Sequence, residues 1–264
     1  MTDSWRQPRR ILMAALGGLT VFYLLAPTLV IVPMSFTEAR ILSFPPEGFS
    51  LQWYERMFTD RQWSTGMVNS LLVAVLTAIV ATVLGTLAAL GLSRGRFPGR
   101  ALVNGLVLSP LIVPVVVIAI GMFGLFVTWR LSGSMVGLVL AHTALALPFV
   151  VVNVSTSLQT MDRNLELAAA NLGADPRRSF LHITLPIILP GVVAGAIFSF
   201  ITSWDEVVVA IFMTSARFRT LPVEMWEQVR QVVDPTVAAV STTLLVVTTA
   251  LLLMLVFVRR QAPT

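Results

Sequence analysis

Charged residues in this chain are separated by six long apolar runs. The charge-free runs cover residues 11–37, 62–93, 101–129, 131–161, 179–204 and 235–258. A helix needs about 20 apolar residues to cross the hydrocarbon core of a bilayer, and each run exceeds that length. The pattern predicts an all-α integral membrane protein with six transmembrane helices, at about residues 11–35, 67–93, 101–127, 134–158, 187–214 and 237–258.

Proline and glycine inside these runs predict local helix shape. Pro110 and Pro114 in the third helix, Pro148 in the fourth and Pro190 in the fifth are expected to kink or locally break the helices. Gly191 and Gly195 form a small-xxx-small pattern that lets a neighbouring helix approach closely. Because we find no internal repeat and no low-complexity linker, residues 1–264 are predicted to form a single transmembrane domain.

Composition and charge agree with a membrane protein. Of the 264 residues, 12% are charged and 56% are hydrophobic, whereas soluble domains carry roughly 25% charged residues. All 18 basic residues are Arg, and placing both termini in the cytoplasm puts eleven of them on the inner side and seven on the outer side. The positive-inside rule favours this orientation. The Arg content therefore reflects topology, and no nucleic-acid partner is predicted.

Several kinds of chemistry are excluded by the residues present. The chain has no Lys, so it cannot form the GxxxxGK[ST] loop of an ATP site. Gly91–Gly95 matches the GxSxG nucleophile pattern, but that pattern needs a strand–turn–helix and here it ends a membrane helix. For His142, inside the fourth helix, a hydrogen-bonded packing role is favoured over a role as metal ligand or proton relay. No enzyme active site and no cofactor site are predicted in this chain.

A polar segment, residues 162–186, separates the fourth and fifth membrane helices, and we call it the polar hairpin. Asn164 is a good N-cap for the helix-forming sequence "LELAAANL", and Gly173 lies where a left-handed C-terminal cap is expected. Asp175 followed by Pro176 predicts the start of a second short helix. The local rules therefore predict a helix, a tight turn and another helix.

One face of the polar hairpin carries small residues. Glu166, Ala169 and Gly173 share this face of the first helix, which predicts a shallow surface that another protein could approach closely. Arg177 and Arg178 are expected to face outward. A solvated loop with good capping residues is the alternative interpretation.

The spacing of the polar hairpin resembles a known signature. Ala168-Ala169, then Gly173, then Ile183-x-Leu185-Pro186 is similar to the "EAA, three residues, G, nine residues, I-x-LP" pattern of binding-protein-dependent ABC importer permeases. In that family the hairpin is the coupling helix that docks into a cleft of the ATPase subunit. One position departs, because the signature Glu falls on Leu167 and the carboxylate stands one residue earlier, about 100° away on the helix. The resemblance implies an ATPase-coupling interface made of Glu166, Leu167, Ala168, Ala169, Leu172, Gly173, Asp175, Arg177 and Arg178.

The resemblance extends over the rest of the chain. "GFSLQWYERMF", "SWDEVVVAIF" and "RTLPVEMWEQVRQVVDPTVAAVST" look like the second permease subunit of spermidine/putrescine transporters. It implies a type I importer fold in a bacterial inner membrane, a companion permease subunit, two ATPase subunits that bind ATP and Mg, and an external substrate-binding protein. It also implies a small, cationic solute such as putrescine or spermidine, although relatives in this subclass also carry γ-aminobutyrate, opines or phosphonates.

Two acidic residues, Asp205 and Glu206, interrupt the fifth apolar helix. An acidic residue at a helix centre costs about 2.5–3.5 kcal/mol, so it is usually paired or lines an aqueous cavity. We expect at least one of the two to line the substrate pathway, with Trp204 as a cation–π partner nearby. Pairing with Arg217, Arg219 or the companion subunit is the alternative.

Two other functions remain open at this point. An ion-coupled secondary transporter would carry buried ionisable residues in several helices and often inverted repeats. A membrane-embedded assembly protein would have no transport role. Dependence of uptake on a separate ATPase distinguishes all three.

Overall fold

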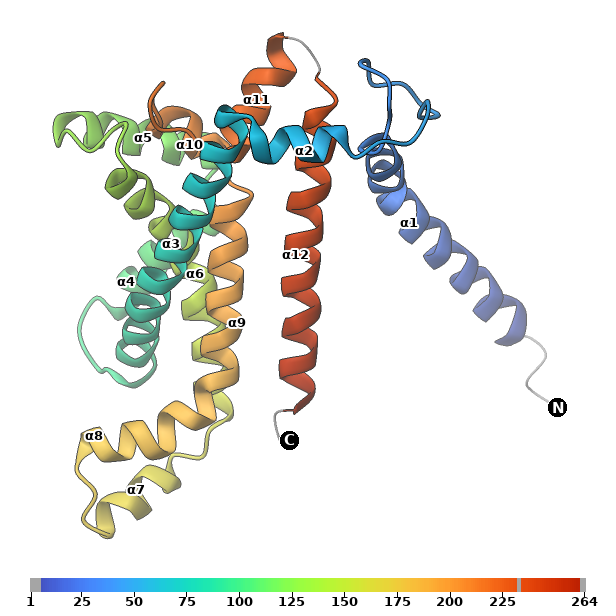
Figure 1. The fold of residues 1–264 in the computed structure, drawn as a ribbon. Coiled ribbons are helices and arrows are strands. Elements are labelled where there is room, and N and C mark those ends of the chain that lie inside the picture. The colour runs from blue at the N-terminus through green and yellow to red at the C-terminus, as the bar shows by residue number, and fades with distance from the viewer. Residues whose placement is uncertain (1–5, 232–233, 262–264) are drawn as a thin grey trace. The chain divides into compact units, whose positions relative to one another are not determined.

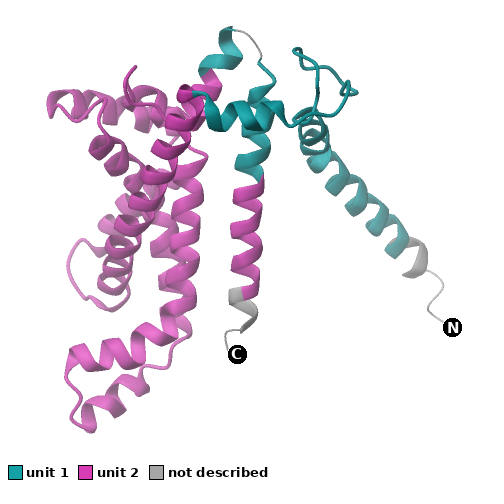
Figure 2. Ribbon diagram, viewed as in Figure 1, with its two compact units in different colours: residues 1–60, 227–245 teal, residues 61–226, 246–264 magenta. Residues whose placement is uncertain are grey.

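A computed structural model describes residues 6–231 and 234–261 of the chain. No β-strand occurs within these ranges, and the elements are helices joined by short loops. The chain forms two compact units, coloured separately in Figure 2. Unit 1 holds residues 1–60 and 227–245, and unit 2 holds residues 61–226 and 246–264. The prediction of a single domain over the whole chain stays a prediction.

Unit 1 is organised around a short amphipathic helix. Its elements are α1 (Arg6–Met34), α2 (Gln52–Thr59) and the first part of α12 (Thr236–Gln261). The loop after α1 is tied back to α2, since Ser35 Oγ lies 2.7 Å from Tyr54 Oη and Trp53 Nε1 donates a 2.8 Å hydrogen bond to the Thr37 carbonyl oxygen. These contacts fix the end of α1 against α2.

The other side of α2 contacts the segment that leads into α12. Arg56 Nη1 lies 2.9 Å from Asp234 Oδ2. Met57 is 1% exposed, and its sulfur accepts a 3.7 Å hydrogen bond from Thr243 Oγ1. Two adjacent residues of α2, Arg56 and Met57, therefore connect this helix to residues 234–243 through an ion pair and a buried side chain.

Unit 2 contains the remaining helices (Figure 1). They are α3 (Arg61–Arg94), α4 (Arg100–Leu108), the 3-10 turn η1 (Ser109–Leu111), α5 (Val115–Thr128), α6 (Met135–Thr160), α7 (Asn164–Asn171), α8 (Pro176–Ser179), the π-helical turn η2 (Phe180–Thr184), α9 (Leu185–Trp204) and α10 (Val208–Met213). The helix α11 (Leu221–Gln231) and α12 lie partly in each unit.

Helices α3, α6 and α9 form the core of unit 2, and small residues let them approach closely (Figure 1). Val150 of α6 is 0% exposed and lies between two glycines. A Cβ atom added at Gly85 of α3 would lie 2.6 Å from Val150 Cβ, and one added at Gly195 of α9 would lie 2.9 Å from Val150 Cα. At Gly191 the added atom would lie 2.7 Å from the Asn153 carbonyl oxygen. The predicted small-xxx-small contact is confirmed.

The third predicted helix, residues 101–127, is interrupted near Pro110 and Pro114, as the sequence predicted. It is divided into α4 and α5, which are bent by 108° at the break. The break falls at Pro110 and Pro114, which were expected to interrupt the helix, because Pro cannot donate the backbone hydrogen bond that a helix interior requires. Pro114 precedes the first residue of α5.

The fifth predicted helix, residues 187–214, is wrong in extent. Helix α9 ends at Trp204, and a separate short helix, α10, begins at Val208. The chain turns here because the Glu206 carboxylate accepts hydrogen bonds from the first free amide groups of α10, at 2.8 Å from Val209 N and 2.9 Å from Ala210 N. A carboxylate in this position starts a new helix instead of continuing the old one.

The apolar content of these helices fits a multi-pass membrane protein. Among the described residues, five helices are long and apolar enough to cross a membrane, and there are six spans if α4, η1 and α5 count as one broken span. The predicted helices at 11–35, 67–93, 134–158 and 237–258 correspond to α1, α3, α6 and α12. The all-helical class is confirmed.

Candidate functional site

The polar hairpin forms the predicted helix–turn–helix at one end of α6 and α9 (Figure 1). Gly173 has φ +84°, the left-handed conformation expected at the end of α7. Asp175 caps α8, since its Oδ1 accepts a 2.8 Å hydrogen bond from the Arg178 backbone N–H. Pro176 is the first residue of α8. These three positions were predicted from local rules and are confirmed. The predicted N-cap is wrong, because α7 begins at Asn164 itself and the Asp162 carboxylate accepts a 2.9 Å hydrogen bond from the Asn164 backbone N–H.

The two faces of α7 differ in what they offer to a partner. Leu167 is 62% exposed and Leu172 is 89% exposed. Ala168 and Gly173 are also exposed, as are Asp175, Arg177 and Arg178 of the second arm. Exposed apolar side chains next to a solvated turn are a feature of protein interaction sites.

The opposite face of α7 is turned toward the rest of unit 2, which corrects the predicted shallow docking surface. Ala169 is buried at 8% exposure. Glu166 lies 2.5 Å from Nη2 of Arg94, at the end of α3, and Thr184 Oγ1 donates a hydrogen bond to the same carboxylate oxygen. The face that carries Glu166 and Ala169 is therefore used inside the chain. The exposed residues lie on the other side of the helix.

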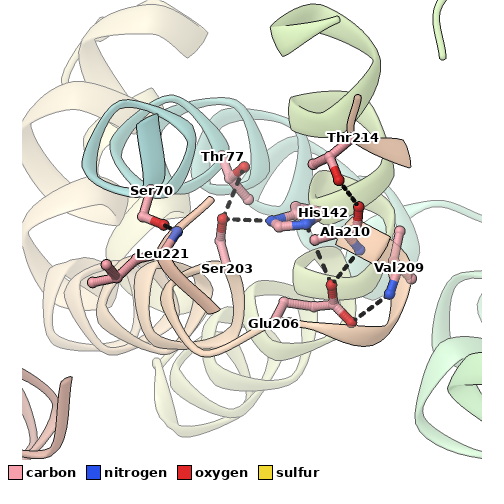
Figure 3. A network of polar contacts seen from close by, with 9 residues as sticks. All are labelled: Ser70, Thr77, His142, Ser203, Glu206, Val209, Ala210, Thr214 and Leu221. Carbon is pink, nitrogen blue, oxygen red and sulfur yellow. Dashed lines mark hydrogen bonds and ion pairs between the residues drawn. The ribbon is translucent and has the colours of Figure 1, made fainter. Parts of the chain in front are cut away.

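A second polar cluster joins the core helices where α9 ends (Figure 3). Ser203 Oγ lies 2.8 Å from His142 Nδ1 and 3.4 Å from Thr77 Oγ1, so α9, α6 and α3 are linked at one point. His142 Nε2 lies 3.5 Å from a Glu206 carboxylate oxygen. His142 is 1% exposed and hydrogen-bonded, as the sequence indicated.

Ser203, His142 and Glu206 follow one another like a Ser–His–acid triad. A nucleophile needs access to substrate and donors for the developing oxyanion. Ser203 is 4% exposed, and the Glu206 carboxylate accepts two backbone amide hydrogen bonds of α10. This arrangement therefore has a structural role, because it holds three helices and a capped turn together.

Asp205 and Trp204, the other two predicted pathway residues, have different surroundings. Asp205 is exposed, and its carboxylate accepts a 3.2 Å hydrogen bond from Thr248 Oγ1 on α12. Trp204 is 4% exposed and stacks on Phe200 with ring centroids 5.7 Å apart. Of the three residues, only Asp205 has an exposed side chain in this conformation. Neither acid forms an ion pair with Arg217 or Arg219 among the described residues.

A basic cavity of about 460 Å³ lies at the other end of α3 from the polar hairpin. Its lining residues are Arg61, Gln62, Thr65, Gly66, Ala216, Arg217, Arg219 and Glu224. Glu224 is buried and accepts a 2.6 Å hydrogen bond from Gln62 Nε2. Arg219 lies 3.6 Å from the same carboxylate, whereas Arg61 and Arg217 have no ion pair among the residues that the structure describes. The sequence alone does not indicate this cavity, since its two groups of lining residues, at 61–66 and 216–224, lie at least 150 positions apart.

Residues 81–263 match the family model described as "Binding-protein-dependent transport system inner membrane component". The chain is 34% identical over 244 residues to the putrescine transport system permease protein PotI of Escherichia coli (strain K12), covering 90% of this chain and 85% of that protein. It is 35% identical over 221 residues to the spermidine/putrescine transport system permease protein PotC of Haemophilus influenzae, covering 83% and 85%.

Solved structures show the same fold. The crystal structure of a bacterial ABC transporter involved in the import of the acidic polysaccharide alginate matches with a TM-score of 0.73 at 16% identity, covering 100% of this chain and 99% of that chain. A second structure, of the alginate transporter in complex with an alginate pentasaccharide-bound periplasmic protein, matches with a TM-score of 0.70 at 16% identity. At this identity the similarity concerns the fold.

Proposed function

This chain belongs to the family of binding-protein-dependent transport system inner membrane components, and on this premise we propose that it is one permease subunit of an ATP-driven polyamine importer. The observation that carries the proposal is the polar hairpin, which lies between the core helices α6 and α9 and presents exposed leucines. Putrescine and spermidine are the solutes named for the PotI and PotC relatives, and they support a small polycation as substrate.

The exposed face of the polar hairpin is the proposed docking surface for a separate ATPase subunit. Leu172 and Leu167 would enter an apolar cleft, and Arg177 and Arg178 would meet acidic residues at its rim. ATP and Mg would be bound by the ATPase, since this chain lacks the Lys of a phosphate-binding loop. Two ATPase subunits, a companion permease and an external substrate-binding protein complete the proposed importer. This assembly places the polar hairpin and both termini in the cytoplasm.

The proposed pathway residue in this chain is Asp205. Its carboxylate is exposed and accepts a hydrogen bond from the Thr248 hydroxyl. A primary ammonium group could replace that hydroxyl and donate a charge-assisted hydrogen bond instead. Glu206 and Trp204 would reach the pathway only if the junction between α9 and α10 rearranged, because the Glu206 side chain is 8% exposed and Trp204 is 4% exposed.

The basic cavity is the proposed contact for the substrate-binding protein. In the proposed orientation it opens on the outer side, and Arg61 and Arg217 would donate hydrogen bonds to carboxylates of a docking loop. A cavity lined by three Arg repels a polyamine, which argues against a role as a substrate site. The partner would be the binding protein on which transport systems of this family depend.

The test is ATPase stimulation in the assembled complex. The four subunits are reconstituted in nanodiscs, and ATP hydrolysis is measured with and without putrescine-loaded binding protein. We expect stimulation that is lost in Gly173→Asp, because φ +84° strains any side chain at the turn of the polar hairpin. Gly99→Asp is the matched control, since Gly99 has φ +82° with open space around it and lies outside the polar hairpin. Uptake driven by a proton or sodium gradient without an ATPase would instead establish the secondary transporter.

A further inference from the structure

Three elements of unit 2 meet at the Glu166 carboxylate. Arg94 stands in the last turn of α3, Glu166 in the first turn of α7, and Thr184 at the end of η2. Arg94 Nη2 lies 2.5 Å from Glu166 Oε1, and the Thr184 hydroxyl donates to the same oxygen. The three residues thus connect the polar hairpin to two of the three core helices.

This junction is partly shielded from solvent. The Arg94 and Glu166 side chains are 32% and 22% exposed, and Thr184 is 0% exposed. Hydrogen bonds between ionised partners are roughly twice as strong as neutral ones, and partly buried pairs are screened less by salt than exposed pairs. The contact can therefore hold α7 in one orientation relative to α3.

The backbone at this junction is also specialised. Residues Phe180–Thr184 form a π-helical turn between α8 and α9. Single π turns within α-helices occur frequently at functional sites. Here the π turn carries Thr184 to the Glu166 carboxylate, so the second arm of the polar hairpin runs into α9 through a segment that is bonded to the first arm.

This geometry gives the carboxylate at position 166 a different role from that of a Glu at position 167. At position 167, where the permease signature has Glu, this chain has an exposed Leu. At position 166, about 100° around the helix, the carboxylate points inward. The charge that the signature would direct outward is here neutralised within the chain by Arg94.

We propose that Arg94, Glu166 and Thr184 form an internal brace, which makes the polar hairpin, α3 and α9 move as one body when the ATPase moves the hairpin. Glu166 is then a positioning residue, and the exposed leucines make the docking contact. This inference rests on the proposed coupling of the polar hairpin to an ATPase. It adds that the motion reaches the core at two helices. Glu166 contacts Arg94, 72 positions away in the sequence, on one side and Thr184, 18 positions away, on the other.

The brace is tested by the coupling ratio, in proteoliposomes that hold the full importer. Copurified ATPase, ATP hydrolysis and putrescine uptake are measured for Arg94→Gln, Glu166→Gln and the charge swap Arg94→Glu/Glu166→Arg. We expect each single variant to retain the ATPase subunits but to transport at least about fivefold less putrescine per ATP, the low end of typical coupling factors. The swap should recover most of that loss. Arg96→Gln, an exposed Arg two residues away, should leave the ratio unchanged.

A second experiment keeps the inference falsifiable if the swap does not assemble. The chain contains no Cys, so Arg94→Cys/Glu166→Cys can be bridged selectively by a short bifunctional thiol reagent. Bridging should restore the coupling ratio that the unbridged pair has lost.

Four outcomes would overturn the brace. They are inhibition by the bridge, a wild-type coupling ratio in both single variants, a swap that assembles but recovers nothing, and loss of ATPase subunits from Glu166→Gln. The last would make Glu166 itself a docking residue. All four leave the proposed function intact, whereas a wild-type complex that binds no ATPase overturns the proposed function.

Discussion

Truncating Leu172 to Ala tests the proposed docking surface quantitatively. Leu172 is 89% exposed, so nearly all of its side chain is available for burial by a partner. The change removes three carbons, and each buried methylene contributes about 0.8 kcal/mol. If docking buries the exposed nine-tenths, Leu172→Ala weakens ATPase binding by about 2 kcal/mol, or about 30-fold. The same reasoning for Leu167, which is 62% exposed, gives about 1.5 kcal/mol or about 12-fold.

The assay is a titration of the ATPase subunit onto the permease pair in nanodiscs, with affinity measured for wild type and each variant. Leu102→Ala is the matched control, since Leu102 of α4 is 68% exposed and loses the same three carbons away from the polar hairpin. The reasoning is refuted if Leu172→Ala binds within about twofold of wild type. It is refuted equally if Leu102→Ala weakens binding as much, because burial of the polar hairpin would then not be the cause.

The remaining predictions concern the core and the proposed pathway. Gly195→Ala should lower the thermal stability of the purified complex, since the new Cβ would lie 2.9 Å from Val150 Cα and overpacking costs about 1–3 kcal/mol. Gly91→Ala, with no atom within 4 Å of its Cβ, should be neutral or stabilising, and an equal melting temperature for both variants would contradict the packing. Glu206→Gln should destabilise the complex by about 1.5–3 kcal/mol in a detergent melt, the range for hydrogen bonds to a charged group, and an unchanged melt would show that the carboxylate does not hold α10. Asp205→Asn should raise the KM for putrescine uptake by about tenfold or more while ATPase binding stays normal, and an unchanged KM would remove Asp205 from the proposed pathway.

Features fixed by neighbours in sequence were predicted well. The length of each apolar run determines whether a helix can span a bilayer, and four of the predicted helices correspond to single helices in the structure. The turn of the polar hairpin was also predicted, since Gly173, Asp175 and Pro176 act through their own backbone and the next few amide groups. Local capping chemistry needs no knowledge of the fold.

The two helix breaks show what local sequence rules did not predict. Pro110 and Pro114 signalled an interruption, but the angle of 108° between α4 and α5 depends on what each half packs against. At residues 205–206 the sequence suggested an acidic interruption within a continuing helix. The Glu206 side chain instead accepts amide hydrogen bonds three and four residues later, a capping pattern that could have been recognised in advance.

Long-range partners could not be predicted from one sequence. Arg94 and Glu166 are 72 residues apart, and His142 and Ser203 are 61 apart. Nothing in the sequence neighbourhood of Glu166 distinguishes it from a solvated helix-start carboxylate, and several other Arg residues near predicted helix ends could have been its partner. Only the packing of α3 against α6 and α9 selects Arg94.

The two proposed functional regions each carry a pair of neighbouring residues with different surroundings. In the polar hairpin consecutive helical residues point about 100° apart, and Glu166 is bonded within the chain while Leu167 is exposed. Between α9 and α10 the Glu206 side chain is 8% exposed and caps α10, whereas Asp205 is exposed. In both pairs one acid is held by groups of the chain and its neighbour is open to a partner. We therefore expect a shift of one position in a family signature to change which residue meets the partner, and the exposed member of each pair is the one to test for transport.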